Sequence, residues 1–195
     1  MIEIPTRDLI LRDVELETPF LLVIAESPSL ESSEFEQTLL DDNGAMLLKM
    51  LELFNLQYVT KVSYLINQAV DKPSKKQAYQ CYRDYLFVDI AYYKPQYILL
   101  LGNFVSKFFL KTDNAISTIQ GVPYHLPLEL PETIDKRETK NRKKLYTEKA
   151  YNFVPLQDLG ACLRDTSLPY NGCKYHWKET LSLIKQRFDE DLKSF

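Results

Sequence analysis

The sequence predicts an α/β fold in which helices cover both faces of a short, four-stranded parallel sheet, giving a three-layer sandwich. Short runs of apolar residues alternate along the chain with longer segments of helical periodicity, as in folds built from strand–helix–strand units. The first of these runs is continuously apolar, which is typical of a strand buried on both faces. The length of 195 residues fits one domain, so we expect residues 1–195 to form a single unit.

Four segments are predicted as strands because they are rich in apolar, β-branched or aromatic residues. The first has the sequence Phe-Leu-Leu-Val-Ile-Ala and stops at a cluster of turn-forming residues. The second contains valine, threonine, isoleucine and tyrosine, which favour strands. The complete set of predicted strands is 20–25, 58–66, 97–101 and 151–156.

Helices are predicted between these strands from apolar residues spaced three and four apart. Residues 32–53 have this spacing, and Asn43-Gly44 is predicted as a turn that divides them into two helices. Ser74 is a favourable N-cap for a helix that continues to Tyr93. Two further helices are predicted at 104–110 and 174–192, and an extended segment at 116–126.

The predicted ligand site lies where the parallel strands end. In open α/β sheets, ligands bind outside the carboxyl ends of the strands. Polar residues follow several of the predicted strands at this edge. The strand ends are Glu26-Ser27-Pro28, Leu65-Ile66-Asn67, Gly102-Asn103 and Leu156-Gln157-Asp158.

The composition excludes several classes of protein. The formal net charge is −3, so the chain is not a uniformly basic nucleic-acid binder, although a local basic patch is compatible with it. No apolar run reaches the length of about 18 residues that indicates a transmembrane helix. The first residues also lack the pattern of a signal peptide. We therefore expect a cytoplasmic protein that does not interact with membranes.

The cysteine and histidine content predicts neither a metal site nor a bound cofactor. Cys81, Cys162 and Cys173 are an odd number at wide spacing, which predicts reduced thiols rather than a disulfide framework. His125 and His176 are the only histidines, and no Cys-x-x-Cys pair occurs. A structural zinc site is therefore not expected.

Residues 127–149 are predicted as a charged loop. Residues 136–149 contain seven Lys or Arg and two Glu. Two interpretations stay open: Arg142, Lys143 and Lys144 contact DNA phosphates, or the loop is simply solvated. The tyrosines of the helix before Pro95 likewise have two interpretations, as base-stacking residues or as core and partner surface.

Five short motifs follow one another in a recognisable order. They are an acidic strand end before a proline, a glycine before a leucine-rich helix, a cysteine-containing helix, a strand ending in Leu-Gly, and a Lys-x-x-Trp sequence opening the last helix. In this order they resemble the uracil-DNA glycosylase superfamily, most closely its iron–sulfur bacterial branch, family 4, over about residues 20–190. The motifs are Ala25-Glu26-Ser27-Pro28-Ser29, Gly44-Ala45-Met46-Leu47-Leu48, Cys81-Tyr82, Lys94-Pro95 through Leu100-Leu101-Gly102, and Lys174-Tyr175-His176-Trp177.

The resemblance implies a uracil-DNA-glycosylase-like sandwich but not the iron–sulfur cluster of that branch. The branch holds its cluster with four cysteines, two of them in an N-terminal Cys-x-x-Cys that this chain lacks. Cys81 resembles one remaining ligand, whereas Leu65 stands where another cysteine is expected. A [4Fe–4S] cluster needs four thiolates, so none is expected here.

The resemblance also implies a base pocket in which most of the family's functional residues are replaced. The family stacks a Phe on uracil, and Leu39 or Leu40 occupies that register here. It reads the base edge with an Asn, which aligns with Lys61, while Asn67 lies nearby out of register. The family's His against the uracil carbonyl aligns with Asp158, and Glu26 is the acidic residue retained. The implied pocket comprises Ser27, Pro28, Leu39, Leu40, Lys61 and Asn67.

Two functions are therefore expected from the sequence. The first is a non-catalytic pseudoenzyme of DNA replication or repair that uses the fold as a DNA- or protein-binding scaffold. The second is a divergent glycosylase that hydrolyses the N-glycosidic bond of a flipped base with Glu26 as its acidic residue. An ionised Asp158 would repel the departing base anion, which favours the first.

Overall fold

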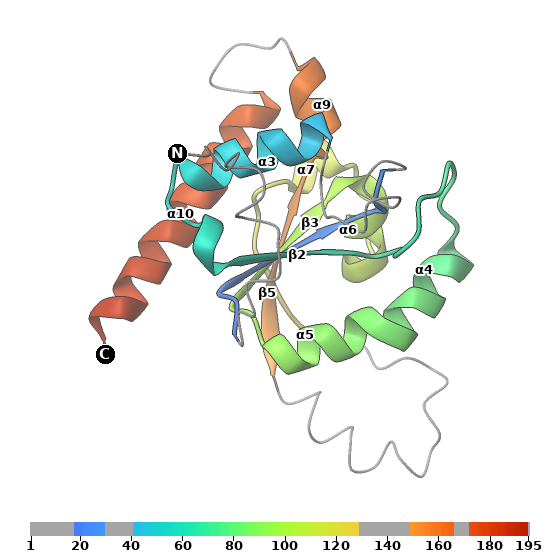
Figure 1. Cartoon of the computed structure of the whole chain (residues 1–195), viewed down its shortest axis with the longest axis horizontal. Helices are drawn as coiled ribbons and strands as arrows, with labels where there is room; N and C mark the ends of the chain where they lie inside the picture. Colours follow the sequence, from blue (N-terminus) through green and yellow to red (C-terminus); the bar gives the residue numbers. More distant parts are fainter. Residues whose placement is uncertain (1–17, 30–40, 129–148, 166–171, 195) are drawn as a thin grey trace, which may run out of the picture.

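The computed structural model describes residues 18–29, 41–128, 149–165 and 172–194. Its centre is a five-stranded sheet of order β2-β1-β3-β5-β4 (Figure 1). The four predicted strands are confirmed, and they pair in parallel. The strands are β1 (Leu21–Ala25), β2 (Thr60–Tyr64), β3 (Tyr97–Leu101), β4 (Tyr124–Pro127) and β5 (Ala150–Leu156).

The sheet has one strand more than the sequence predicts. The segment predicted as extended around Gly121 begins with the short helix α7 (Ile116–Ile119) and continues into β4. Strand β4 pairs antiparallel with β5 at the edge of the sheet. Next to this ladder, Nδ1 of His125 lies 3.0 Å from Oδ1 of Asn152.

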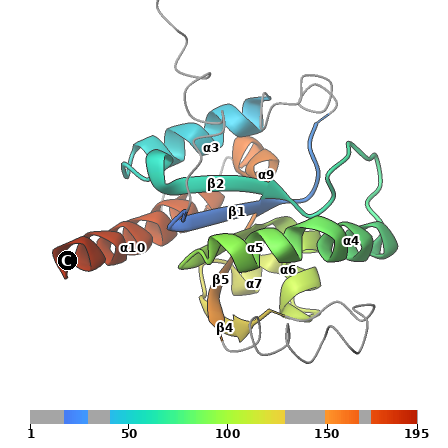
Figure 2. The same ribbon diagram turned by 60° about the horizontal axis from the view of Figure 1, so that its bottom comes forward.

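Helices cover both faces of the sheet, as predicted. In strand β1, Leu21 and Val23 point into one buried cluster, whereas Leu22 and Ile24 point into the other. This alternation explains the continuous apolar run, because each face of the strand needs apolar side chains. Figure 2 shows the two helical layers on opposite sides of β1 and β2.

We name the two layers after the helices that form them. The α3–α9–α10 layer packs on the face of Leu21 and contains the three helices of that name. The α4–α6 layer packs on the face of Leu22. The helices are α3 (Asp42–Glu52), α9 (Leu159–Arg164) and α10 (Cys173–Lys193) in the first layer, and α4 (Lys75–Cys81), η2 (Tyr82–Leu86), α5 (Phe87–Tyr93) and α6 (Gly102–Leu110) in the second.

The helix predicted from Ser74 is confirmed. Ser74 Oγ accepts from the Gln77 amide while Gln77 Oε1 accepts from the Ser74 amide, a complete capping box. The helix runs through a π-helical turn, η2, to Tyr93 and ends where Lys94 takes a left-handed conformation with φ of 49°. The proline at position 95 follows this end, as expected from its inability to continue a helix.

The turn predicted at Asn43-Gly44 is wrong. Helix α3 already begins at Asp42, and Asp41 is its N-cap, accepting from the Gly44 amide at 3.0 Å. Both Asn43 and Gly44 therefore belong to the first helical turn. An aspartate directly before a helical segment is a strong start signal, which here outweighs the turn propensity of Asn-Gly. The earlier part of the predicted helical segment lies outside the described residues.

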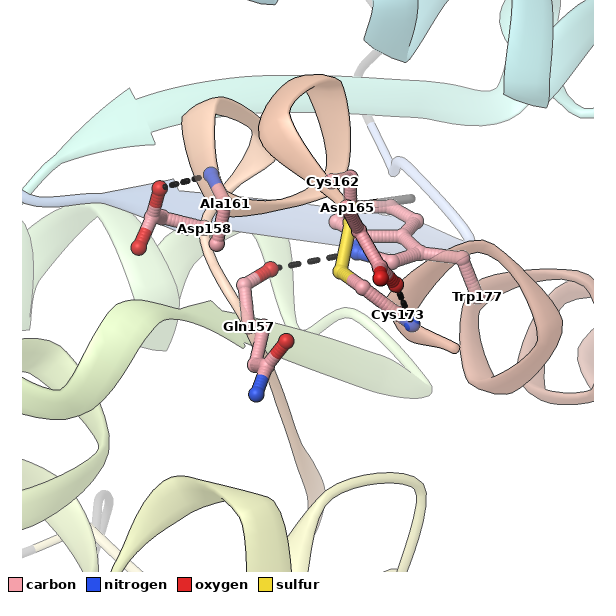
Figure 3. Close-up of a disulfide and its surroundings, with 7 residues drawn as sticks. All are labelled: Gln157, Asp158, Ala161, Cys162, Asp165, Cys173 and Trp177. Atoms are coloured by element: carbon pink, nitrogen blue, oxygen red, sulfur yellow. Dashed lines mark hydrogen bonds between the residues drawn. A yellow bond between two sulfur atoms is a disulfide. The ribbon is translucent and has the colours of Figure 1, made fainter. Parts of the chain in front are cut away.

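The prediction of three reduced thiols is wrong for one pair. Cys162 of α9 and Cys173 of α10 form a disulfide, while Cys81 is free (Figure 3). Both helices pack on the same face of the sheet, and this brings the two Cα atoms to 5.2 Å, within the usual disulfide range. Thiol content therefore no longer supports the expected cytoplasmic location.

Candidate functional site

A cavity of about 780 Å³ opens at the carboxyl ends of the central strands. The chain leaves β1 toward β2 on one side and later returns to β3 on the other, so a topological switch point lies between β1 and β3. Residues within two positions of the ends of β1, β3 and β5 line the cavity, namely Glu26, Gly102 and Asp158. The cavity thus lies where the sequence predicted the ligand site.

Gly102 allows the strands to end close together. It has a φ of +84°, a left-handed conformation that side chains rarely adopt, and it turns β3 directly into α6. A Cβ at this position would lie 3.5 Å from the Cβ of Asp158. The glycine therefore lets the backbone turn sharply beside the acidic residue of the neighbouring strand.

Asp158 is the N-cap of helix α9 and lines the cavity. Its Oδ1 accepts a hydrogen bond from the Ala161 amide at 2.7 Å (Figure 3). The backbone around Gly160 is close to this carboxylate, since a Cβ at Gly160 would lie 3.2 Å from Asp158 Oδ1 and 3.5 Å from Asn43 Oδ1. Asp158, which the sequence analysis placed at the family's His position, thus has a capping role that was not predicted.

Glu26 provides a second carboxylate at the same end of the cavity. Its backbone carbonyl accepts from the Ile66 amide at 2.9 Å, which fixes the chain just beyond β1. Burial, and then the negative charge of Asp158, raise the pKa of the half-buried Glu26 carboxyl above its ordinary value. Asp158 is therefore near enough to act on the Glu26 carboxyl.

Three lysines line the opposite wall of the cavity. Lys75 lies in the first turn of α4, Lys107 in the last turn of α6, and Lys111 directly after α6. The ammonium group of Lys111 donates to the Tyr79 hydroxyl at 3.1 Å and lies 4.8 Å from the centre of the Phe108 ring. This wall therefore combines positive charge with aromatic rings.

The structure brings together only part of the predicted site. Glu26, Ser27 and Asp158 line the cavity. Pro28 is buried next to them but is not among the described lining residues. Leu39, Leu40, Arg142, Lys143 and Lys144 lie outside the described residues.

Two predicted pocket residues lie elsewhere in the fold. Lys61 is the second residue of β2, and its ammonium group lies 4.4 Å from the centre of the Tyr93 ring. Asn67 Oδ1 accepts from the Cys81 thiol at 3.3 Å on the exposed side of α4. Neither is among the described residues that line the cavity.

The sequence analysis missed several lining residues. Asp41, Asn43 and Tyr64 line the cavity together with the three lysines. Tyr64 is the last residue of β2, so the rule that predicted the other strand ends also applies to it. Lys75 comes from α4, whereas Lys107 and Lys111 come from α6 and the residue after it, far apart in the sequence from Lys75.

The chain is an α/β sandwich with a cavity at the switch point of a largely parallel sheet. The family model of the uracil DNA glycosylase superfamily matches residues 13–154. The chain therefore belongs to this superfamily, whose general context is DNA repair. Glu26 lies within the matched range, whereas Asp158 and helices α9 and α10 follow it. No curated protein matches the chain.

Two further observations concern other classes of site. Among the described residues, no group of three or more His, Cys, Asp or Glu side chains is arranged to hold a metal ion. None of the helices in the described ranges has the length and apolar content needed to span a membrane.

Proposed function

We propose that this chain is a DNA-binding scaffold of the superfamily that holds DNA without cleaving the bond between base and sugar. In this proposal, the cavity at the carboxyl ends of the strands takes up one nucleotide unit. The protein then serves DNA replication or repair through binding. The observation that carries the proposal is the Asp158 carboxylate on the wall of the cavity.

This charge opposes the chemistry of a glycosylase. Cleavage of an N-glycosidic bond expels the base as an anion, and a hydrogen-bond donor facing such a developing charge contributes roughly 10²–10³ in rate. Asp158 supplies a carboxylate instead of a donor. A base bound against this carboxylate would gain negative charge in an already negative environment, which raises the barrier to cleavage.

The opposite wall supports DNA binding. Lys75, Lys107 and Lys111 surround the same cavity, and lysine contacts with phosphates dominate sequence-independent affinity for DNA. The net charge of −3 does not oppose this function, because the basic residues are concentrated locally. Arg142, Lys143 and Lys144 remain further candidates for phosphate contacts, outside the described residues.

The test combines a cleavage assay with a binding titration on the same DNA. We expect wild-type protein to bind single-stranded and duplex oligonucleotides containing uracil, hypoxanthine or a mismatch, and to leave no abasic sites in them. Protein that binds none of these DNAs would contradict the DNA-binding proposal and favour a protein partner.

A divergent glycosylase is the second candidate function, and the raised pKa of Glu26 favours it. A carboxyl group that keeps its proton nearer neutral pH is a better general acid and can protonate a departing base. Under this alternative, wild-type protein releases base and Glu26→Gln does not, although both fold and bind DNA. Such a result would replace the scaffold by an enzyme.

A further inference from the structure

The cavity is polarised, because each helical layer contributes charges of mainly one sign. Asp41 and Asp158 cap α3 and α9 in the α3–α9–α10 layer, and Glu26 ends the strand between the layers. Lys75 and Lys107 belong to the α4–α6 layer. Asp113 is the one lining acid that follows α6, among the described residues. A ligand that spans the cavity therefore meets acceptors on one side and cations on the other.

The acceptors on the acidic side differ in their availability. Asp158 already accepts from the Ala161 amide through Oδ1. The Glu26 carboxylate accepts no hydrogen bond from the described part of the chain, and it is half-exposed toward the cavity. Glu26 therefore offers both of its carboxylate oxygens to a ligand, whereas Asp158 next to it already uses one.

A carboxylate accepts hydrogen bonds through two oxygens and pairs best with two donors on one edge of a planar group. Among the nucleic-acid bases, guanine has such an edge, formed by its N1–H and its 2-amino group. Uracil and thymine present one N–H between two carbonyl oxygens, which a carboxylate repels. Cytosine and adenine offer one amino group beside an acceptor nitrogen.

We propose that the cavity binds a guanine nucleotide unit of DNA, with Glu26 accepting from the Watson–Crick edge of the base and Lys75 and Lys107 contacting its phosphates. This inference rests on the proposed DNA-binding function and assigns the base that the site selects. It differs from the uracil preference that the family name suggests, because the acidic wall rejects the two carbonyl groups of uracil. The volume of about 780 Å³ accommodates a purine nucleotide.

The test measures the affinity of the full chain for fluorescein-labelled single-stranded thymidine oligonucleotides that carry one variable central base. We expect guanine to bind roughly tenfold to a hundredfold more tightly than uracil, because a bidentate pair to a base discriminates to about this extent. Hypoxanthine, which lacks the 2-amino group, and N1-methylguanine should both lose most of the preference. The analogue 7-deazaguanine keeps the edge and should retain it.

Variants of the chain assign the preference to the cavity. Glu26→Gln should bind guanine and uracil oligonucleotides almost equally, because an amide offers one acceptor and one donor. Glu179→Gln removes the same charge from the exposed surface of α10 and should keep the preference. A thermal unfolding curve for each variant shows that the protein titrated is folded.

Each other outcome contradicts a distinct part of the account. Equal affinity of wild-type protein for guanine and uracil oligonucleotides overturns the guanine assignment but leaves the DNA-binding scaffold standing. A preference that Glu26→Gln retains overturns the role of Glu26. Binding of free deoxyguanosine monophosphate as tightly as the oligonucleotide overturns the assignment to DNA. Binding to no oligonucleotide at all overturns the proposed function itself.

Discussion

The two layers that enclose the cavity are held in different ways. In the α3–α9–α10 layer, the Cys162–Cys173 disulfide joins α9 to α10, and the buried Trp177 donates from Nε1 to the Gln157 carbonyl at 3.1 Å (Figure 3). The chain is thus fixed directly before and shortly after Asp158. In the α4–α6 layer, the rings of Tyr79, Tyr82, Phe108 and Phe109 pack against one another.

This difference suggests a division of roles between the two walls. On the acidic wall, the backbone around Asp158 is held by a covalent bond and a buried indole, so this carboxylate keeps a defined geometry. The basic wall consists of lysines, whose long side chains have many rotamers. A rigid wall suits selection of a base, and an adaptable wall suits contact with a flexible phosphate backbone.

The largest effect is expected at Trp177. Its side chain is fully buried against the sheet, so Trp177→Ala should lower the free energy of unfolding by about 3–5 kcal/mol through lost burial and a cavity. Tyr85→Ala in the other layer removes a ring that is 58% exposed. It should change the free energy of unfolding by less than about 0.5 kcal/mol. Urea denaturation measures both. Similar losses in the two variants would contradict the assigned difference between the layers.

The disulfide should have the next largest effect. The double variant Cys162→Ala/Cys173→Ala opens a loop with a sequence separation of 11 residues and should lose about 3 kcal/mol of unfolding free energy. Cys81→Ala is the matched control, because its thiol is free. Treatment of wild-type protein with a thiol reductant should reproduce the loss. Equal stability with and without reductant would show that the bond does not hold this layer.

A smaller effect is expected at the cap of α9. Asp158→Ala removes the acceptor for the Ala161 amide, whereas Asp158→Asn keeps an oxygen there. Both variants remove the charge beside Glu26. The difference between their free energies of unfolding therefore reports the hydrogen bond to the Ala161 amide alone. The alanine variant should therefore be less stable than the asparagine variant by about 1 kcal/mol. Equal urea midpoints would argue against the capping role.

The smallest effect is expected from the pH dependence of Glu26. Its pKa is higher in the folded than in the unfolded chain, because of burial and Asp158. The Glu26 carboxyl therefore stabilises the folded chain at pH values below its pKa in the unfolded chain. This contribution is lost as the pH rises through the higher pKa that the carboxyl has in the folded chain. Glu26→Gln should accordingly gain stability relative to wild type between acidic and neutral pH. A difference that is constant over this range, measured by thermal unfolding, would contradict the raised pKa.

The sheet was predictable from the sequence because strands buried on both faces leave continuous apolar runs, as in Leu21–Ala25. Strand β4 was not, since it lies at the edge with alternating exposure and contains Pro127. Helix α9 has only six residues, too few for a periodic pattern, and its signal was the Asp158 cap. The disulfide depends on how two helices pack, which their spacing in the sequence does not reveal.

The site residues that follow the ends of strands were predictable from the sequence. The site residues that the packing of the helical layers brings to the cavity were not. Glu26 and Asp158 follow predicted strands, so the topology rule places them at one edge. The resemblance to the family predicted that Lys61 would lie in the base pocket. Its side chain instead contacts Tyr93, and it is not among the described residues that line the cavity. The lysine wall comes from helices α4 and α6, whose proximity is set only by the folded sheet.

The most direct test of the account measures how salt weakens binding of a single-stranded oligonucleotide to a variant of the basic wall. In Lys75→Ala/Lys107→Ala, affinity should fall for every sequence. The slope of log affinity against log salt should decrease in magnitude by roughly 0.7 for each lost phosphate contact. Lys174→Ala/Lys178→Ala removes equal charge from the exposed surface of α10 and should leave affinity and slope nearly unchanged. Equal slopes for the first variant and wild type would show that DNA does not bind in this cavity.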